Sequence, residues 1–139
     1  MDPAAWLEPM LSPRSIAIVG ASDRAGSFGR STLEQTIAGG FTGEIFPVNP
    51  RLSEALGLRC YPSLADLPRP ADLVVLVVAN DALESQLDLV SRTGCKSAVI
   101  FASGYLENDH EPPLTERLAA IARSYGLPLC GANCMGFVR

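Results

Sequence analysis

The stretch Ser15-Ile16-Ala17-Ile18-Val19-Gly20-Ala21-Ser22 decides the fold of this chain. Its first five residues form an apolar run that favours a buried β-strand, and the glycine that follows permits a tight turn. Gly26 and Gly29 come next, where a helical pattern begins near Phe28. A glycine turn from a strand into a helix is typical of a phosphate site, because amides at a helix start face the anion. The spacing is not G-x-G-x-x-G, so a purely structural turn is the alternative.

Length and composition indicate one globular domain, residues 1–139, with 47% hydrophobic and 19% charged residues. No apolar stretch approaches the roughly 20 residues of a membrane span, and the start Met1-Asp2-Pro3 lacks the basic region of a signal peptide. We therefore expect a cytoplasmic protein with no membrane partner. The net charge of −4 argues against nucleic acid as a partner, since such binding needs a basic surface.

The cysteines and the single histidine predict neither a metal site nor a disulfide framework. None of the four cysteines forms a Cys-x-x-Cys pair, so we expect reduced thiols and no metal in this domain. His110 lies in the acidic segment 107–111 and is expected at the surface without a catalytic role.

Strand and helix patterns alternate along the chain, which predicts an α/β fold, a Rossmann-like doubly wound sheet of five parallel strands with helices on both faces. A short helix over 4–11 should precede a core over about 14–139. Turns are expected at 53–56 and within 61–68. One apolar helix face should hold Leu114, Leu118, Ile121, Ala122 and Tyr125. The expected strands are 15–19, 43–48, 72–78, 97–101 and 127–130, and the expected helices, each ending at a glycine, are 28–38, 82–93 and 112–125.

Two of the loops at the carboxyl ends of these strands predict a ligand. Ser22 and Arg24 in the first loop offer a hydroxyl and a charge to a phosphate. The second loop, Asn49-Pro50-Arg51, lies where a site for NAD needs a carboxylate for the ribose hydroxyls. A guanidinium there suits a nucleotide with an extra ribose phosphate. The alternative is a simple turn with a solvated charge.

Three motifs carry a resemblance to a known family. They are Ser-Ile-Ala-Ile-Val-Gly-Ala-Ser from Ser15, Gly-Phe-Thr-Gly-Glu-Ile-Phe-Pro-Val-Asn-Pro from Gly40, and Tyr-Pro-Ser-Leu-Ala-Asp-Leu-Pro from Tyr61. In this order they closely resemble the N-terminal CoA-binding domain of NDP-forming acyl-CoA synthetases, including ADP-forming acetate–CoA ligases. More distantly, the chain is similar to the α subunit of succinyl-CoA synthetase. The resemblance runs from about Leu11 to the last residue.

The resemblance implies a CoA site and a role for each matching position. The first loop would cradle the CoA phosphates, and Arg51, where the family commonly has lysine, would approach the nucleotide phosphates. Asn80 and Asp81 stand where relatives often have proline, and we expect these two side chains to cap the next helix. The residues implied to bind CoA are Gly20, Ala21, Ser22, Arg24, Asn49, Pro50, Arg51, Val78, Ala79, Phe101, Ala102, Ser103, Gly104, Asn133 and Cys134.

The last loop, Gly131-Ala132-Asn133-Cys134-Met135-Gly136, looks like the family's Gly-Pro-Asn-Cys-x-Gly motif with Ala132 in place of proline. In the family this segment lies near the thiol end of CoA. Cys134 is therefore either a neighbour of the CoA sulfur, able to form a mixed disulfide, or a buried and inert thiol.

The resemblance also limits what the chain can do by itself. In full-length relatives an ATP-grasp domain phosphorylates a histidine in a CoA-ligase domain, where the acid, CoA and ATP or GTP give acyl-CoA, ADP or GDP, and phosphate. The sequence carries no such machinery, so we expect no catalytic residue here and a first domain of a longer chain. The alternatives are a separate or regulatory CoA-binding module and a fragment of an NADP-dependent oxidoreductase.

Overall fold

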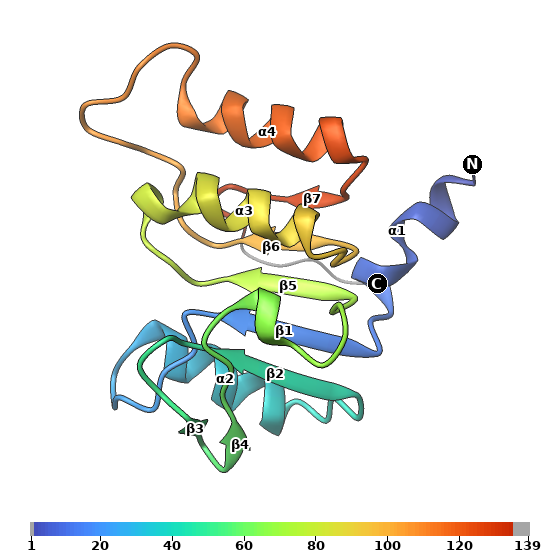
Figure 1. Ribbon diagram of the computed structural model, residues 1–139, viewed down its shortest axis with the longest axis vertical. Coiled ribbons are helices and arrows are strands. Elements are labelled where there is room, and N and C mark those ends of the chain that lie inside the picture. Colours follow the sequence, from blue (N-terminus) through green and yellow to red (C-terminus); the bar gives the residue numbers. More distant parts are fainter. Residues whose placement is uncertain (1, 135–139) are drawn as a thin grey trace.

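A computed structural model describes residues 2–134. Five parallel strands form one sheet in the order β2-β1-β5-β6-β7, which confirms the expected doubly wound α/β fold (Figure 1). From β1 the chain first steps to one side to reach β2, and the later strands of this sheet lie on the other side of β1. The reversal of order therefore lies between β1 and β5. The strands are β1 (Ser15–Val19), β2 (Glu44–Val48), β5 (Leu73–Leu76), β6 (Ala98–Ile100) and β7 (Leu129–Cys130).

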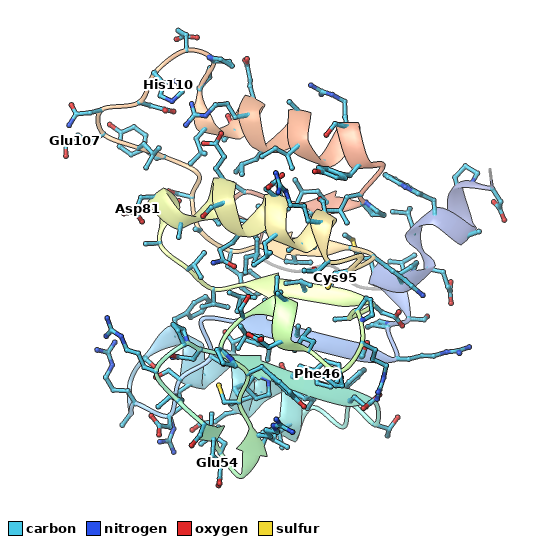
Figure 2. The ribbon with its side chains drawn as sticks, in the orientation of Figure 1. Phe46, Glu54, Asp81, Cys95, Glu107 and His110 are labelled. Atoms are coloured by element: carbon cyan, nitrogen blue, oxygen red, sulfur yellow. The ribbon has the colours of Figure 1, made fainter. Side chains whose placement is uncertain are left out.

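Helices cover both faces of the sheet, so successive strand residues are buried on opposite sides. On one face, Val19 and Leu76 pack with α3 (Leu83–Arg92) and α4 (Leu114–Tyr125). Phe46 and Cys95 belong to this layer (Figure 2). On the other face, Ile18, Val75 and Val99 pack with Leu33 of α2 (Phe28–Ala38). The uninterrupted apolar runs in the sequence follow from burial on both faces.

The helix ends follow the predicted chemistry. Ser27 caps α2 by accepting a hydrogen bond from the amide of Arg30. Glycines with positive φ follow the ends of α2, α3 and α4, at Gly40, Gly94 and Gly126. The expected position of Tyr125 on the buried face of α4 is wrong, because the ring is 49% exposed. It lies in the last turn of α4, where its hydroxyl reaches Asp88 of α3 at 3.5 Å.

The N-terminal helix α1 (Pro3–Leu11) lies at the amino-terminal end of the strands, on the right of Figure 1. Within this helix Met10 is buried, and the indole Nε1 of Trp6 donates to the carbonyl of Gly126 at 2.8 Å. None of the helices within residues 2–134 has the length and apolar character needed to cross a membrane.

The prediction of a helical turn at 53–56 is wrong. The segment forms a hairpin of β3 (Glu54–Ala55) and β4 (Leu58–Arg59). Its two central residues, Leu56 and Gly57, have φ values of 48° and 82°, as a type I′ turn requires. The turn expected within 61–68 is confirmed as the short 3₁₀ helix η1 (Leu64–Asp66).

Candidate functional site

A cleft of about 750 Å³ opens at the carboxyl ends of β1, β2 and β5. This is the position at which doubly wound sheets bind ligands, next to the reversal of strand order. We call it the Arg51 cleft. Six residues singled out from the sequence line it: Gly20, Asn49, Pro50, Arg51, Val78 and Ala79. The other lining residues are Val19, Val48, Pro62, Ser63 and Gln86.

Gly20 and Gly29 let the first loop pack closely against its neighbours. Gly20 has φ +93°, and a Cβ there would collide with the carbonyl oxygen of Val77 at the end of β5. A Cβ at Gly29, in the first turn of α2, would collide with the carbonyl oxygen of Gly20. The amide of Gly20 donates to the carbonyl of Val48 at 3.0 Å. The loop is therefore held between two strand ends and the start of a helix.

Asn49 joins the first and second loops. Its Nδ2 donates to the carbonyl of Ala21 at 2.9 Å, and its Oδ1 accepts from the amide of Arg51 at 2.8 Å. The second bond is that of an Asx turn, so Asn49 starts the turn that holds Arg51. Beneath the turn, burial raises the pKa of Cys60, whose thiol lies 3.8 Å from the carbonyl of Asn49. Asn49 thus fixes where Arg51 lies relative to the glycine loop.

In the part of the chain that the structure describes, the exposed cations of the two loops have no carboxylate partner. Within residues 2–134, neither Arg24 nor Arg51 forms an ion pair. Ser22 Oγ accepts from the amide of Arg24 at 3.0 Å, which leaves the hydroxyl proton available to donate. Ala21 is fully buried and can offer a ligand only its backbone. The first and second loops therefore present donors and positive charge, which suit an anion.

Asn80 does not cap a helix, contrary to expectation. It begins the 3₁₀ helix η2 (Asn80–Ala82), and neither η2 nor α3 has a side-chain cap at its N-terminus. Its Nδ2 instead donates to Ser103 Oγ at 3.1 Å, and its Oδ1 accepts from the amide of Gly104 at 2.8 Å. Asp81 points outward at the start of η2 (Figure 2). Asn80 therefore connects the loop after β5 to the loop after β6.

Phe101 and Cys134 lie apart from the Arg51 cleft, on the α2 side of the sheet. They line a hollow of about 550 Å³ with Phe28, Ser31, Thr32, Gln35 and Thr36, here named the Phe28 groove. The rings of Phe28 and Phe101 pack edge to face with their centroids 5.7 Å apart, and Phe28 is 60% exposed. Of the fifteen expected site residues, six line the Arg51 cleft and two line the Phe28 groove. Neither hollow is lined by the other seven, which are Ala21, Ser22, Arg24, Ala102, Ser103, Gly104 and Asn133.

The last loop is tied to the end of β6. The amide of Asn133 donates to the carbonyl of Ala102 at 2.6 Å, and that of Cys134 donates to the carbonyl of Ile100 at 3.0 Å. The sulfurs of Cys130 and Cys134 lie 2.8 Å apart. The contact with Cys134, together with burial, raises the pKa of Cys130 to about 11. Met135 and Gly136 of the sequence motif lie outside the described residues.

Five lining residues were not singled out as ligands from the sequence; Val19 and Val48 end the predicted strands β1 and β2, and the other three come from elsewhere in the chain. Pro62 and Ser63 belong to a motif that was used only for the resemblance, and their position follows from hydrogen bonds between Tyr61 and the end of β2. Gln86 comes from α3 and had no local signal, because its place depends on how that helix packs over the sheet.

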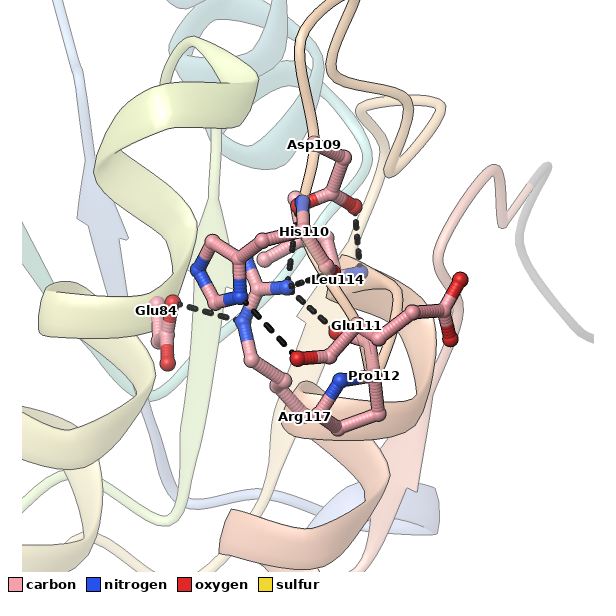
Figure 3. Close-up of polar contacts among 7 residues, drawn as sticks. All are labelled: Glu84, Asp109, His110, Glu111, Pro112, Leu114 and Arg117. Atoms are coloured by element: carbon pink, nitrogen blue, oxygen red, sulfur yellow. Dashed lines mark hydrogen bonds and ion pairs between the residues drawn. The ribbon is translucent and has the colours of Figure 1, made fainter.

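His110 is exposed, as predicted, and belongs to a polar network around Arg117 (Figure 3). Arg117 is only 11% exposed and binds Asp109 at 2.9 Å and Glu84 of α3 at 3.1 Å. Asp109 also accepts from the amide of Leu114 at 2.7 Å. That bond, with help from Arg117, lowers the pKa of Asp109. The network fixes the long loop between β6 and α4.

The described residues contain no group of three or more His, Cys, Asp or Glu side chains arranged to hold a metal ion. At the carboxyl edge the described residues offer backbone amides, side-chain amides, hydroxyls, guanidinium groups and two thiols.

A family model described as "CoA binding domain" matches residues 14–139. The chain is 37% identical over 131 residues to a trans-feruloyl-CoA synthase from an unknown prokaryotic organism. The match covers 94% of this chain but 18% of that protein. It is 35% identical over 129 residues to an ADP-forming 4-hydroxybutyrate–CoA ligase of Nitrosopumilus maritimus, with coverages of 92% and 18%. The chain thus spans less than a fifth of these relatives. The apo structure of dinucleotide forming acetyl-coenzyme A synthetase 1 from Ca. Korarchaeum cryptofilum superposes with a TM-score of 0.86 at 36% identity, covering 95% of this chain and 29% of that one.

Proposed function

The chain belongs to the family of CoA-binding domains, and from that premise we propose that the Arg51 cleft holds the nucleotide end of CoA. The domain corresponds to the N-terminal part of ADP-forming acyl-CoA synthetases. CoA carries a phosphate on its ribose, which NAD lacks. The observation that supports the proposal most is the Arg51 guanidinium, which lines the cleft without a carboxylate partner in the described residues.

In this proposal each part of the cleft meets one part of the nucleotide. Arg51 pairs with the ribose phosphate through a charge-assisted contact. Backbone amides of Gly20, Ala21 and Ser22, with the Ser22 hydroxyl, donate to the diphosphate, and Arg24 adds charge. Val78 and Ala79 supply the apolar surface for the adenine.

The rest of the proposed site follows the carboxyl edge toward the Phe28 groove. Ser103 and Gly104, held by Asn80, lie between the Arg51 cleft and the last loop in strand order. Phe101, Ala102, Asn133 and Cys134 then provide the surface for the pantetheine arm and its thiol. The order of the strands thus gives the order of the contacts.

The activity of the enzyme to which this domain would belong is a further proposal. We propose that this domain binds CoA for an enzyme that joins a carboxylic acid to CoA at the expense of ATP or GTP. A phosphohistidine in a further domain or subunit would carry the phosphate, and an ATP-grasp domain would supply it. The cytoplasm, where thiols stay reduced, is the proposed location. Reading the native gene past the codon for Arg139 tests this directly: continuation into both further domains supports it, and a stop codon there with no partner subunit encoded contradicts it.

Titration calorimetry of the chain with CoA, dephospho-CoA, NADPH and NADH tests the ligand. We expect CoA to bind most tightly and dephospho-CoA to bind at least about tenfold more weakly, because one charge-assisted hydrogen bond contributes about 1.5–3 kcal/mol. NADPH that binds as tightly as CoA would contradict the proposal and favour the oxidoreductase alternative.

A further inference from the structure

Two of the four cysteines lie side by side at the end of the sheet. Cys130 ends β7, Cys134 ends the loop that follows, and their sulfurs are 2.8 Å apart. A disulfide bond is about 2.05 Å long, so bonding requires the sulfurs to approach by less than about 1 Å. Both side chains are partly exposed. The backbone of the loop is already fixed by the bonds from Asn133 and Cys134 to the end of β6.

The other two cysteines differ from this pair in their exposure and in the groups that lie beside their thiols. Cys60 and Cys95 are each only 5% exposed. The thiol of Cys60 points to the carbonyl of Asn49, and that of Cys95 lies 3.5 Å from the hydroxyl of Thr93. They therefore serve as internal controls within the same chain.

We propose that Cys130 and Cys134 form a redox-active dithiol that is oxidised to an intrachain disulfide by a low-molecular-weight disulfide. The reagent reaches Cys134 through the Phe28 groove, which this residue lines. The proposal does not depend on CoA binding, because it concerns only the two protein thiols and a small disulfide.

The geometry assigns different roles to the two thiols. The two sulfurs lie 2.8 Å apart, and this contact together with burial raises the pKa of Cys130 to about 11, so Cys130 keeps its proton at neutral pH. Of the two residues, Cys134 lines the Phe28 groove by which the reagent arrives, and Cys130 does not. The first attack therefore falls to Cys134, and Cys130 is the resolving cysteine.

The exchange balances in two steps. In the first, the Cys134 thiolate attacks one sulfur of the reagent, the reagent's S–S bond breaks, and one small thiolate leaves and takes up a proton. In the second, Cys130 gives its proton to solvent and attacks the Cys134 sulfur, which releases the second small thiol. The two protein thiols lose two electrons, and the small disulfide gains them.

The test is to treat the reduced chain with glutathione disulfide and to follow intact mass and released glutathione. We expect the wild-type chain to lose two hydrogens and to release two glutathiones per chain, without a lasting adduct. The change should map to the tryptic peptide 124–139, which contains both residues. Cys130→Ser should accumulate one glutathione on Cys134, and Cys134→Ser should react at least about tenfold more slowly than the wild type.

Cys60→Ser and Cys95→Ser should react as the wild-type chain does, and circular dichroism checks that each variant is folded. A stable glutathione adduct on the wild-type chain, oxidation that maps to Cys60 or Cys95, or a Cys134→Ser chain that reacts as fast as the wild type would overturn the proposal. The wild-type peptide map decides the matter even where a variant fails to fold.

Discussion

Gly20 and Gly26 both have positive φ values, +93° and +81°, yet they differ in their surroundings. A Cβ at Gly26 meets nothing within 4 Å, whereas one at Gly20 collides with the carbonyl of Val77. We predict that Gly26→Ala lowers the free energy of unfolding by about 1 kcal/mol, the cost of the left-handed conformation alone. Gly20→Ala should cost at least about 2 kcal/mol and weaken CoA binding, because the loop must move.

Urea unfolding and CoA titration of both variants check this prediction. Equal losses of stability would show that conformation, and not contact with β5, explains the glycine at position 20.

Asp109 provides a prediction about pH. Its pKa is lowered in the folded chain by the Leu114 amide and Arg117, so the stabilisation is present above the unfolded pKa of about 3.9 and is lost as the pH falls through the folded value. We predict that Asp109→Asn is less stable than the wild type at pH 7 and that the difference shrinks as the pH falls below about 4, the unfolded pKa. Denaturant unfolding across this range measures it.

The matched control is Glu107→Gln, which removes a charge from the exposed outer part of the same loop (Figure 2). It should leave the pH dependence of stability unchanged. If both variants respond to pH alike, the effect belongs to net charge and not to the Asp109 contacts.

Asn80 connects two elements of the fold, because its side-chain amide joins η2 to the loop after β6. We predict that Asn80→Ala lowers the free energy of unfolding by about 1–2 kcal/mol, since two hydrogen bonds are lost. CoA binding should weaken as well, because Ser103 and Gly104 are no longer held. Asp81→Ala removes the exposed neighbour and should have little effect on either quantity; thermal unfolding and calorimetry compare the two.

The elements differed in how well the sequence predicted them. Local patterns gave the bounds of β1 and α2 correctly, because an apolar run and a capped amphipathic segment are each complete within a few residues. The β3–β4 hairpin was missed since Leu56, which has positive φ, is an unusual residue for that conformation. Asn80 resembled a helix cap in sequence, but its partners lie more than twenty residues away.

At the scale of the whole molecule, the sheet order explains how the candidate site is assembled. The alternation of strand and helix predicted a doubly wound sheet, and hence that the strand ends would meet at one edge. The Arg51 cleft confirms that expectation for six residues. The separate position of Phe101 and Cys134 in the Phe28 groove could not be predicted, because it depends on which face α2 covers and how far it extends.

The central claim is that Arg51 recognises the ribose phosphate of CoA. The most direct measurement is the Kd of CoA and of dephospho-CoA for the wild-type chain, for Arg51→Ala and for Arg123→Ala, which removes an exposed cation from α4. The account predicts that the wild type and Arg123→Ala prefer CoA by roughly tenfold or more, and that Arg51→Ala binds both ligands with the same, weaker affinity. An Arg51→Ala chain that still prefers CoA as strongly as the wild type would contradict it.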